Sequence, residues 1–139
     1  MRKPFTQIYL HCVWSTWDRL PLITPENEKS IYAAILAKCH QLECDVIALG
    51  GVADHVHLLI KVPPSLCISD VMREIKGSSS HLMSHHVTPG EFFKWQGAYG
   101  VYSISQEHVP RVKAYIERQK QHHAEQDLQP EWEITFTEG

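Results

Sequence analysis

The stretch DHVHLLIKV, residues 54–62, constrains the fold of this chain more than any other. Successive side chains of a β-strand point to opposite faces, so two sets of residues alternate along it. One set is aliphatic and consists of Val56, Leu58, Ile60 and Val62. The other consists of His55, His57, Leu59 and Lys61. The aliphatic set predicts a face packed under helices, which leaves the two imidazoles on the opposite, open face, about 7 Å apart along the strand.

Two imidazoles at this spacing can converge on one cation, but the pattern has a simpler explanation. The chain contains 10 histidines among 139 residues. Chance alone then supplies on the order of one His-x-His pair. From the strand alone, the pair is therefore either a packing feature or half of a metal site.

Periodicity and turn residues predict the other elements. The expected strands are 5–14, 45–52, 55–62 and 97–105. One helix is expected to begin at Thr24-Pro25, and two more are expected at about 68–84 and 108–124. Residues 131–137 are expected to form a short strand or a docked arm. Strands 45–52 and 55–62 are joined by Ala53-Asp54 and predict a hairpin. In the helix of 68–84, the segment KGSSS is weak helix material and predicts a bend or a close backbone contact.

The order β-α-β-β-α-β followed by a helix predicts an α+β fold, a ferredoxin-like (RRM-like) antiparallel sheet with an appended C-terminal helix. Residues 1–139 are expected to form a single domain, with a core of about 5–124 and an acidic tail of about 125–139. No apolar run reaches the length of a membrane span, and no signal peptide is recognisable, so we expect a cytoplasmic protein without a membrane partner. Four cysteines at irregular spacing are expected to be buried small hydrophobes, with a zinc site through Cys39 and Cys44 as the weaker alternative.

The net charge of −3 argues against a nucleic-acid partner, but the charge is unevenly distributed. Residues 71–120 carry seven Lys or Arg against four acids, whereas residues 121–139 carry five acids and no Lys or Arg. A local basic surface is therefore compatible with the acidic total.

The last predicted helix contains a candidate partner for the histidine pair. In RVKAYIERQKQHH, Tyr115 and Gln119 are four residues apart and are expected to stack on one helical face. They lie at the edge of the apolar stripe by which this helix would dock, so a phenol and an amide oxygen would face the histidines. The alternative to this functional role is that Tyr115 is a packing residue and Gln119 is solvated. His122 and His123 compete with Gln119 as a third metal ligand.

These residues together resemble a known family. His-hydrophobic-His on a strand, followed far downstream by Tyr-x-x-x-Gln on a helix, is similar to the single-tyrosine HUH transposases of bacterial insertion sequences, including the REP-associated tyrosine transposases. The segments that carry the resemblance cover nearly the whole chain in order: YLHCVWSTWDRLPLI, GGVADHVHLLIKVPP, IKGSSSHLM, WQGAYGVYSIS and YIERQKQHH.

The resemblance implies that Tyr115 is the nucleophile and that His55, His57 and Gln119 hold a divalent metal, Mg²⁺ or Mn²⁺. It implies a metal-dependent enzyme that cleaves and rejoins single-stranded DNA at hairpin-bearing element ends through a 5′-phosphotyrosine intermediate. It also implies a homodimer with composite active sites. The family often has Asn before the first histidine, and Asp54 at this position is expected either to tighten metal binding or to cap the turn, with the turn favoured.

Further expectations concern DNA contacts. The candidate phosphate-binding cations are Lys76, Arg111, Lys113, Arg118 and Lys120, each of which is otherwise a solvated charge. Trp14, Trp95 and Tyr99 are candidates for base stacking, although core packing is the stronger expectation for most of them.

Two rival functions remain open from the sequence. One is a host-adopted single-strand endonuclease of the same fold. The other is a non-catalytic ferredoxin-like module that binds nucleic acid or metal, and the joint presence of His55, His57, Tyr115 and Gln119 argues against it.

Overall fold

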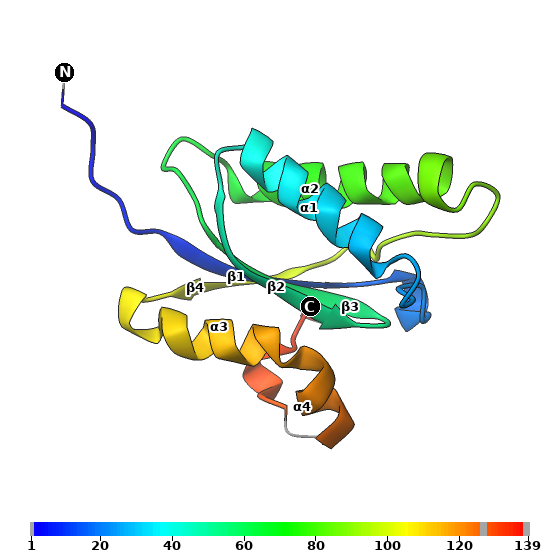
Figure 1. The fold of residues 1–139 in the computed structure, drawn as a ribbon. Helices are drawn as coiled ribbons and strands as arrows, with labels where there is room; N and C mark the ends of the chain where they lie inside the picture. Colours follow the sequence, from blue (N-terminus) through cyan, green and yellow to red (C-terminus); the bar gives the residue numbers. More distant parts are fainter. Residues whose placement is uncertain (1, 126–127, 138–139) are drawn as a thin grey trace.

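Four antiparallel strands form a single sheet in the order β2-β3-β1-β4 (Figure 1). The strands are β1 (Tyr9–Ser15), β2 (Asp45–Val52), β3 (His55–Lys61) and β4 (Gly100–Ile104). The chain is described by a computed structural model that covers residues 2–125 and 128–137. The predicted ferredoxin-like arrangement is confirmed, with β1 starting later and β4 shorter than the sequence suggested.

The helices lie on both faces of this sheet (Figure 1). α1 (Glu28–Gln41) and α2 (Ile68–Leu82) cover one face, and α3 (Val109–Glu117) and α4 (Gln119–Glu125) lie against the other. The aliphatic residues of β3 belong to the core under α1 and α2, as their alternation predicted. The predicted hairpin between β2 and β3 is also confirmed, with Val52 paired to His55 across the turn.

The start of α1 differs from the prediction because of a local hydrogen-bonded turn. The helix was expected to begin at Thr24-Pro25, but it begins at Glu28 with Asn27 as its N-cap residue. The side chains of Thr24 and Asn27 each accept a hydrogen bond from the other residue's backbone amide, at 2.8 Å and 3.2 Å. These bonds close a turn over Thr24–Asn27 and delay the first helical residue.

The weak helical segment KGSSS remains helical, contrary to the bend predicted there. The hydroxyl of Ser79 bonds back to the carbonyl of Ile75 at 2.9 Å and accepts a hydrogen bond from the indole of Trp95 at 2.9 Å. This is a contact between side chains, and a Cβ added at Gly77 would meet no atom within 4 Å, so the close backbone contact predicted as the alternative is not found at that glycine. The irregularity follows later, where Met83–Val87 form a π-turn.

The last helix is two helices, which corrects the prediction of one helix over 108–124. α3 ends at Glu117, Arg118 leaves helical geometry with φ −108° and ψ 23°, and α4 begins at Gln119. α3 lies so close to β2 that a Cβ on Gly50 would come within 2.3 Å of the carbonyl oxygen of Ile116. The change of direction at Arg118 puts Tyr115 and Gln119 on different helices, although both face β3.

The C-terminal arm, residues 128–137, docks on the same face as α3 and α4. It contains a 3-10 turn, Pro130–Trp132, and its Ile134 carbonyl accepts a 2.6 Å hydrogen bond from the hydroxyl of Tyr102. A Cβ on Gly100 would come within 2.1 Å of that carbonyl oxygen, so glycine permits the close approach. Of the two alternatives predicted for residues 131–137, the docked arm is the correct one. None of the helices in the described ranges is long and apolar enough to cross a membrane.

Candidate active site

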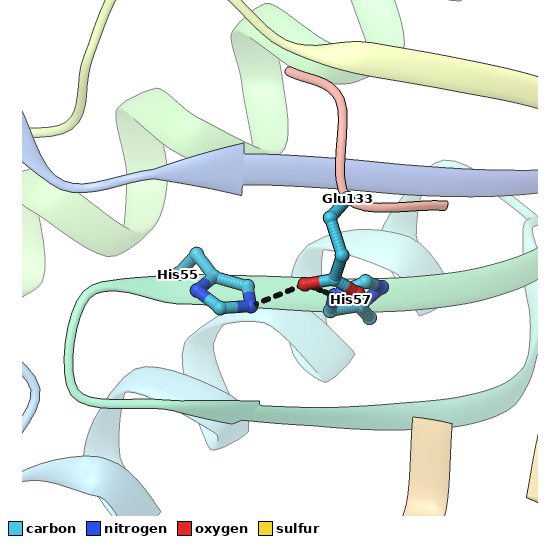
Figure 2. A group of neighbouring side chains, drawn as sticks. All are labelled: His55, His57 and Glu133. Atoms are coloured by element: carbon cyan, nitrogen blue, oxygen red, sulfur yellow. Dashed lines mark hydrogen bonds and ion pairs between the residues drawn. The ribbon is translucent and has the colours of Figure 1, made fainter. Parts of the chain in front are cut away.

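The two histidines of β3 lie on the sheet face opposite the main core, as predicted, but this face is not open: both rings are buried, and the C-terminal arm covers them. Figure 2 shows the carboxylate of Glu133 reaching them from that arm. Its Oε1 lies 3.0 Å from Nε2 of His55, and its Oε2 lies 3.0 Å from Nε2 of His57. One ligand atom from each of these three residues lies within 4.8 Å of the others. The site is thus a compact group of donor atoms suited to a divalent cation.

Each histidine is oriented from behind by a second polar side chain. Nδ1 of His55 lies 2.8 Å from Oδ1 of Asp54, and Nδ1 of His57 lies 2.8 Å from Nε2 of His11 on β1. Such contacts fix the ring so that the other nitrogen, Nε2, faces the site. Of the two roles considered for Asp54, capping of the turn was favoured over an effect on metal binding; its carboxylate contacts His55, one of the proposed ligands, which the alternation of β3 could not reveal.

Tyr115 lies beside this group, because α3 places its side chain against the sheet. Its hydroxyl donates a 2.7 Å hydrogen bond to Oε2 of Glu133 and accepts one of 3.1 Å from the backbone amide of Gln129. Its ring centroid is 5.9 Å from that of His57. The structure therefore brings the predicted nucleophile and the histidine pair together within one chain.

Gln119 and His123 approach the histidine pair from α4, one helical turn apart. Oε1 of Gln119 lies 3.1 Å from Nε2 of His123, and this nitrogen lies 3.1 Å from Nε2 of His55. Gln119 was expected at the rim of the docked helix or, alternatively, in solvent; it is buried. His122, the other competing ligand, instead stacks on the ring of Tyr115 with centroids 4.7 Å apart.

Burial and hydrogen bonds set the protonation states in the site. Burial lowers the pKa of His55, but its contacts with Asp54 and Glu133 outweigh that cost and the pKa is raised overall. Burial and the neighbouring His57 lower the pKa of His11 to about 3, so this ring is neutral. His55 therefore holds a proton more readily than His11 does.

The pKa values of Glu133 and Tyr115 are shifted in opposite directions. Burial opposes ionisation of Glu133, yet hydrogen bonds from both histidines and from Tyr115 hold its pKa well below the usual range. Burial raises the pKa of Tyr115 to about 12. The contact with Glu133 adds to this rise, and the hydrogen bond from the Gln129 amide opposes it. The carboxylate is therefore ionised and the phenol protonated.

Glu133 was not predicted from the sequence, because it lies in an irregular arm whose acids looked like a solvated tail. The only sequence signal was the apolar residue on either side of it in WEI, which suggested docking but not which side chain would point inward.

The five candidate DNA-binding cations are placed differently from one another. The guanidinium of Arg111 lies over the ring of Trp132 at 5.3 Å, and Arg118 lines the same shallow pocket beside Tyr115. Lys113 pairs with Glu117 at 3.9 Å, and Lys120 pairs with Glu28. Lys76 donates to three backbone carbonyls, those of residues 96–98, from the helix-covered side of the sheet.

The other sequence candidates are mostly structural. Trp14 and Trp95 are buried in the core, and Tyr99 packs at its edge with the ammonium of Lys76 5.5 Å from its ring centre. Cys39 and Cys44 are buried free thiols. Among the described residues, the group formed by His55, His57 and Glu133 is the one cluster of three or more such ligands, so the zinc alternative at the cysteines gains no support.

Comparison with known proteins identifies the family of the chain. The sequence model of the family described as "Transposase IS200 like" matches residues 4–119. Curated relatives are the transposases for insertion sequence element IS200 of Salmonella typhimurium and Salmonella typhi, each 25% identical over 73 residues, which cover 52% of this chain. The match spans about half of those relatives, 48% of their length.

Solved structures with the same fold include two proteins described as transposases. One is a candidate transposase of Deinococcus radiodurans R1, with a TM-score of 0.66, 24% identity, and coverage of 86% of this chain and 95% of that one. The other is a REP-associated tyrosine transposase bound to a REP hairpin, with a TM-score of 0.67, 17% identity, and coverage of 88% and 73%. The family model covers most of the chain, and the chain belongs to the IS200-like transposase family.

Proposed function

We propose that this chain is a DNA transposase that cleaves and rejoins single-stranded DNA at hairpin-bearing ends through a 5′-phosphotyrosine intermediate. The observation that supports it best is the convergence of the Tyr115 hydroxyl and the two β3 imidazoles on one carboxylate. A phenol, two imidazoles and a carboxylate in one buried group are the parts that a metal-dependent phosphoryl transfer requires.

The residues present fit a divalent metal. Nε2 of both β3 histidines faces Glu133, and each ring is held from behind by another polar side chain, as metal-ligating histidines usually are. We propose that His55, His57 and Gln119 hold Mg²⁺ or Mn²⁺ and that Glu133 adds a carboxylate oxygen. When bound, the ion would polarise the scissile phosphate and offset the charge that develops on it.

The covalent step uses Tyr115. Its oxygen attacks the phosphorus as the bond from phosphorus to the 3′ oxygen breaks. The upstream strand leaves as a 3′-hydroxyl after its oxygen takes a proton from solvent, and the 5′ phosphate of the downstream strand stays bonded to the tyrosine. Because the phenol is protonated and the Glu133 carboxylate is ionised, Oε2 of Glu133 is the acceptor placed to take the proton as the new ester forms. The reverse attack by a 3′-hydroxyl joins a new end, and it needs no ATP because the phosphodiester energy is kept.

The DNA partner is proposed from the family and from the charges around Tyr115. Arg111 and Arg118 line the pocket beside the nucleophile and are the best placed of the five cations to contact a phosphate there. Lys113 and Lys120 remain candidates at the outer surface of the same helices. Lys76 is a weaker one, because its ammonium already has three carbonyl partners.

We also propose a cytoplasmic homodimer formed by one domain per chain. Tyr115 and the histidines meet within a single chain, so a composite site would require the α3–α4 segment to exchange between subunits. Light scattering of the purified protein, with and without DNA, tests the dimer. A host-adopted endonuclease of the same chemistry is the alternative, and a mobile element flanking the gene would distinguish the two.

One experiment tests the catalytic proposal. The protein is incubated with labelled single-stranded DNA that carries a candidate hairpin end, with Mg²⁺ or Mn²⁺, and covalent adduct is measured on a denaturing gel. We expect adduct from the wild type and none from Tyr115→Phe. Adduct that persists in Tyr115→Phe would exclude this nucleophile, and no adduct from any cognate end would exclude the catalytic proposal.

A further inference from the structure

His123 lies on α4 four residues after Gln119, so both side chains project from the same helical face toward β3. Its side chain is 25% exposed, and its Nε2 points into the group formed by the histidine pair and Glu133. It is neither part of the His-x-His pattern nor part of the Tyr-x-x-x-Gln pattern.

The Nε2 atom of His123 has three close neighbours. It lies 3.1 Å from Nε2 of His55, 3.1 Å from Oε1 of Gln119 and 3.4 Å from Oε1 of Glu133. Two ligands that share an ion at about 2.1 Å are about 3.0 Å apart at right angles and about 3.4 Å apart in a tetrahedron. The observed separations match donors arranged around one ion.

Hydrogen bonds alone do not account for these contacts. With the His55 contact and the shorter His57 contact to Glu133 included, five short contacts join the three imidazole Nε2 atoms with one another or with three oxygens, the two of Glu133 and Oε1 of Gln119. Each Nε2 carries at most one hydrogen. At least two of the five contacts therefore lack a hydrogen of their own, and a cation among the donor atoms would take the place of those hydrogens.

We propose that His123 is a third imidazole ligand of the metal, and that the site prefers a first-row transition-metal ion such as Mn²⁺ over Mg²⁺. This inference specifies the metal site of the proposed function, and it rests on that function for the role of the metal in catalysis. With His123 included, the donor set is three imidazoles, one carboxylate and one amide oxygen.

The preference follows from the donor atoms and from burial. Imidazole suits Mn²⁺ and the later transition metals, whereas Mg²⁺ prefers oxygen ligands and usually keeps several waters. His55 is 2% and His57 0% exposed, and Gln119 is 1% exposed, so the site offers few positions for retained water. A site that is rich in nitrogen and nearly free of water disfavours Mg²⁺, because Mg²⁺ gives up its bound water less readily than Mn²⁺ does.

Metal binding to the purified, metal-free full chain tests the inference without any catalytic readout. Mn²⁺ and Mg²⁺ are titrated by calorimetry, and pulsed EPR on the Mn²⁺ form counts the coupled imidazole nitrogens. His123→Ala and His123→Gln are compared with the wild type. His40→Ala is the matched control, because His40 is an exposed histidine at the end of α1, on the other face of the sheet.

In the wild type we expect three coupled nitrogens and tighter binding of Mn²⁺ than of Mg²⁺. In both His123 variants we expect two nitrogens and a Kd for Mn²⁺ raised about 10- to 100-fold, with His40→Ala unchanged. Two nitrogens in the wild type, or an unchanged Kd for Mn²⁺ in both variants, would overturn the inference.

The outcome separates this inference from the proposed function. Three nitrogens without any Tyr115–DNA adduct would support the ligand assignment while the cleavage proposal fails. If adduct forms and the His123 variants bind Mn²⁺ as the wild type does, the cleavage proposal is supported while the ligand assignment of His123 fails.

Discussion

The hydroxyl of Tyr115 and the carboxylate of Glu133 are joined by a 2.7 Å hydrogen bond between α3 and the C-terminal arm. The same carboxylate contacts both β3 histidines at 3.0 Å. Glu133 therefore connects the proposed nucleophile to the proposed metal ligands, and the arm is part of the site.

Replacing Glu133 with Gln tests this connection. The amide keeps the size of the side chain but cannot take the proton of Tyr115, so we expect adduct formation to slow by on the order of 100-fold in single-turnover assays. Glu131→Gln, on the exposed side of the same turn, is the control and should match the wild type. Faster adduct formation in Glu133→Gln would show that the arm blocks the site.

The docking of the arm depends on the missing side chain of Gly100. A Cβ there would lie 2.1 Å from the carbonyl oxygen of Ile134, so Gly100→Ala should displace the arm while leaving the sheet intact. We expect faster hydrogen exchange in residues 128–137, measured by mass spectrometry, and slower adduct formation. In Gly97→Ala the added methyl group meets no atom within 4 Å, and exchange should not change. Equal exchange in the two variants would contradict the structural role assigned to Gly100.

His11 is expected to act on metal binding through His57. Its Nε2 lies 2.8 Å from Nδ1 of His57, and a phenylalanine would fill the same buried space without that contact. We expect His11→Phe to weaken metal binding about 10- to 100-fold in a calorimetric titration. Circular dichroism should show an unchanged fold, and unchanged metal affinity would mean that the contact does not orient His57.

Lys76 provides a test of stability against pH. Burial lowers its pKa to about 8, whereas in the unfolded chain it titrates near 10.5. Between these values the unfolded state binds more protons, so the free energy of unfolding should rise with pH relative to that of Lys76→Met. Urea unfolding of both proteins at pH 8 and pH 10 measures the difference. A difference that stays constant would show that the ammonium is not destabilised by burial.

The parts of the fold set by side-chain periodicity were predictable. The alternation in β3 placed the aliphatic residues under α1 and α2 and the histidines on the other face, because strand geometry leaves no other arrangement. The likeness to a transposase family and the pairing of the histidines with Tyr115 were predictable too, since both depend on side chains within regular elements.

The contacts made by irregular segments were not predictable. The break at Arg118 depends on how closely α3 lies to Gly50, which is a packing property rather than a local one. The inward direction of Glu133 depends on the docked arm, and the support that Asp54 gives to His55 depends on a turn side chain bending back. No spacing rule in the sequence reports such contacts.

The division of β3 into two faces also decides which changes in chain length the protein can tolerate. Inserting or deleting one residue in the turn at Ala53-Asp54 would reverse the direction of every β3 side chain relative to its neighbours. Both histidines would then point into the hydrophobic layer, and Val56 and Leu58 would replace them beside Tyr115. We therefore expect relatives to keep the turn between β2 and β3 at a constant length.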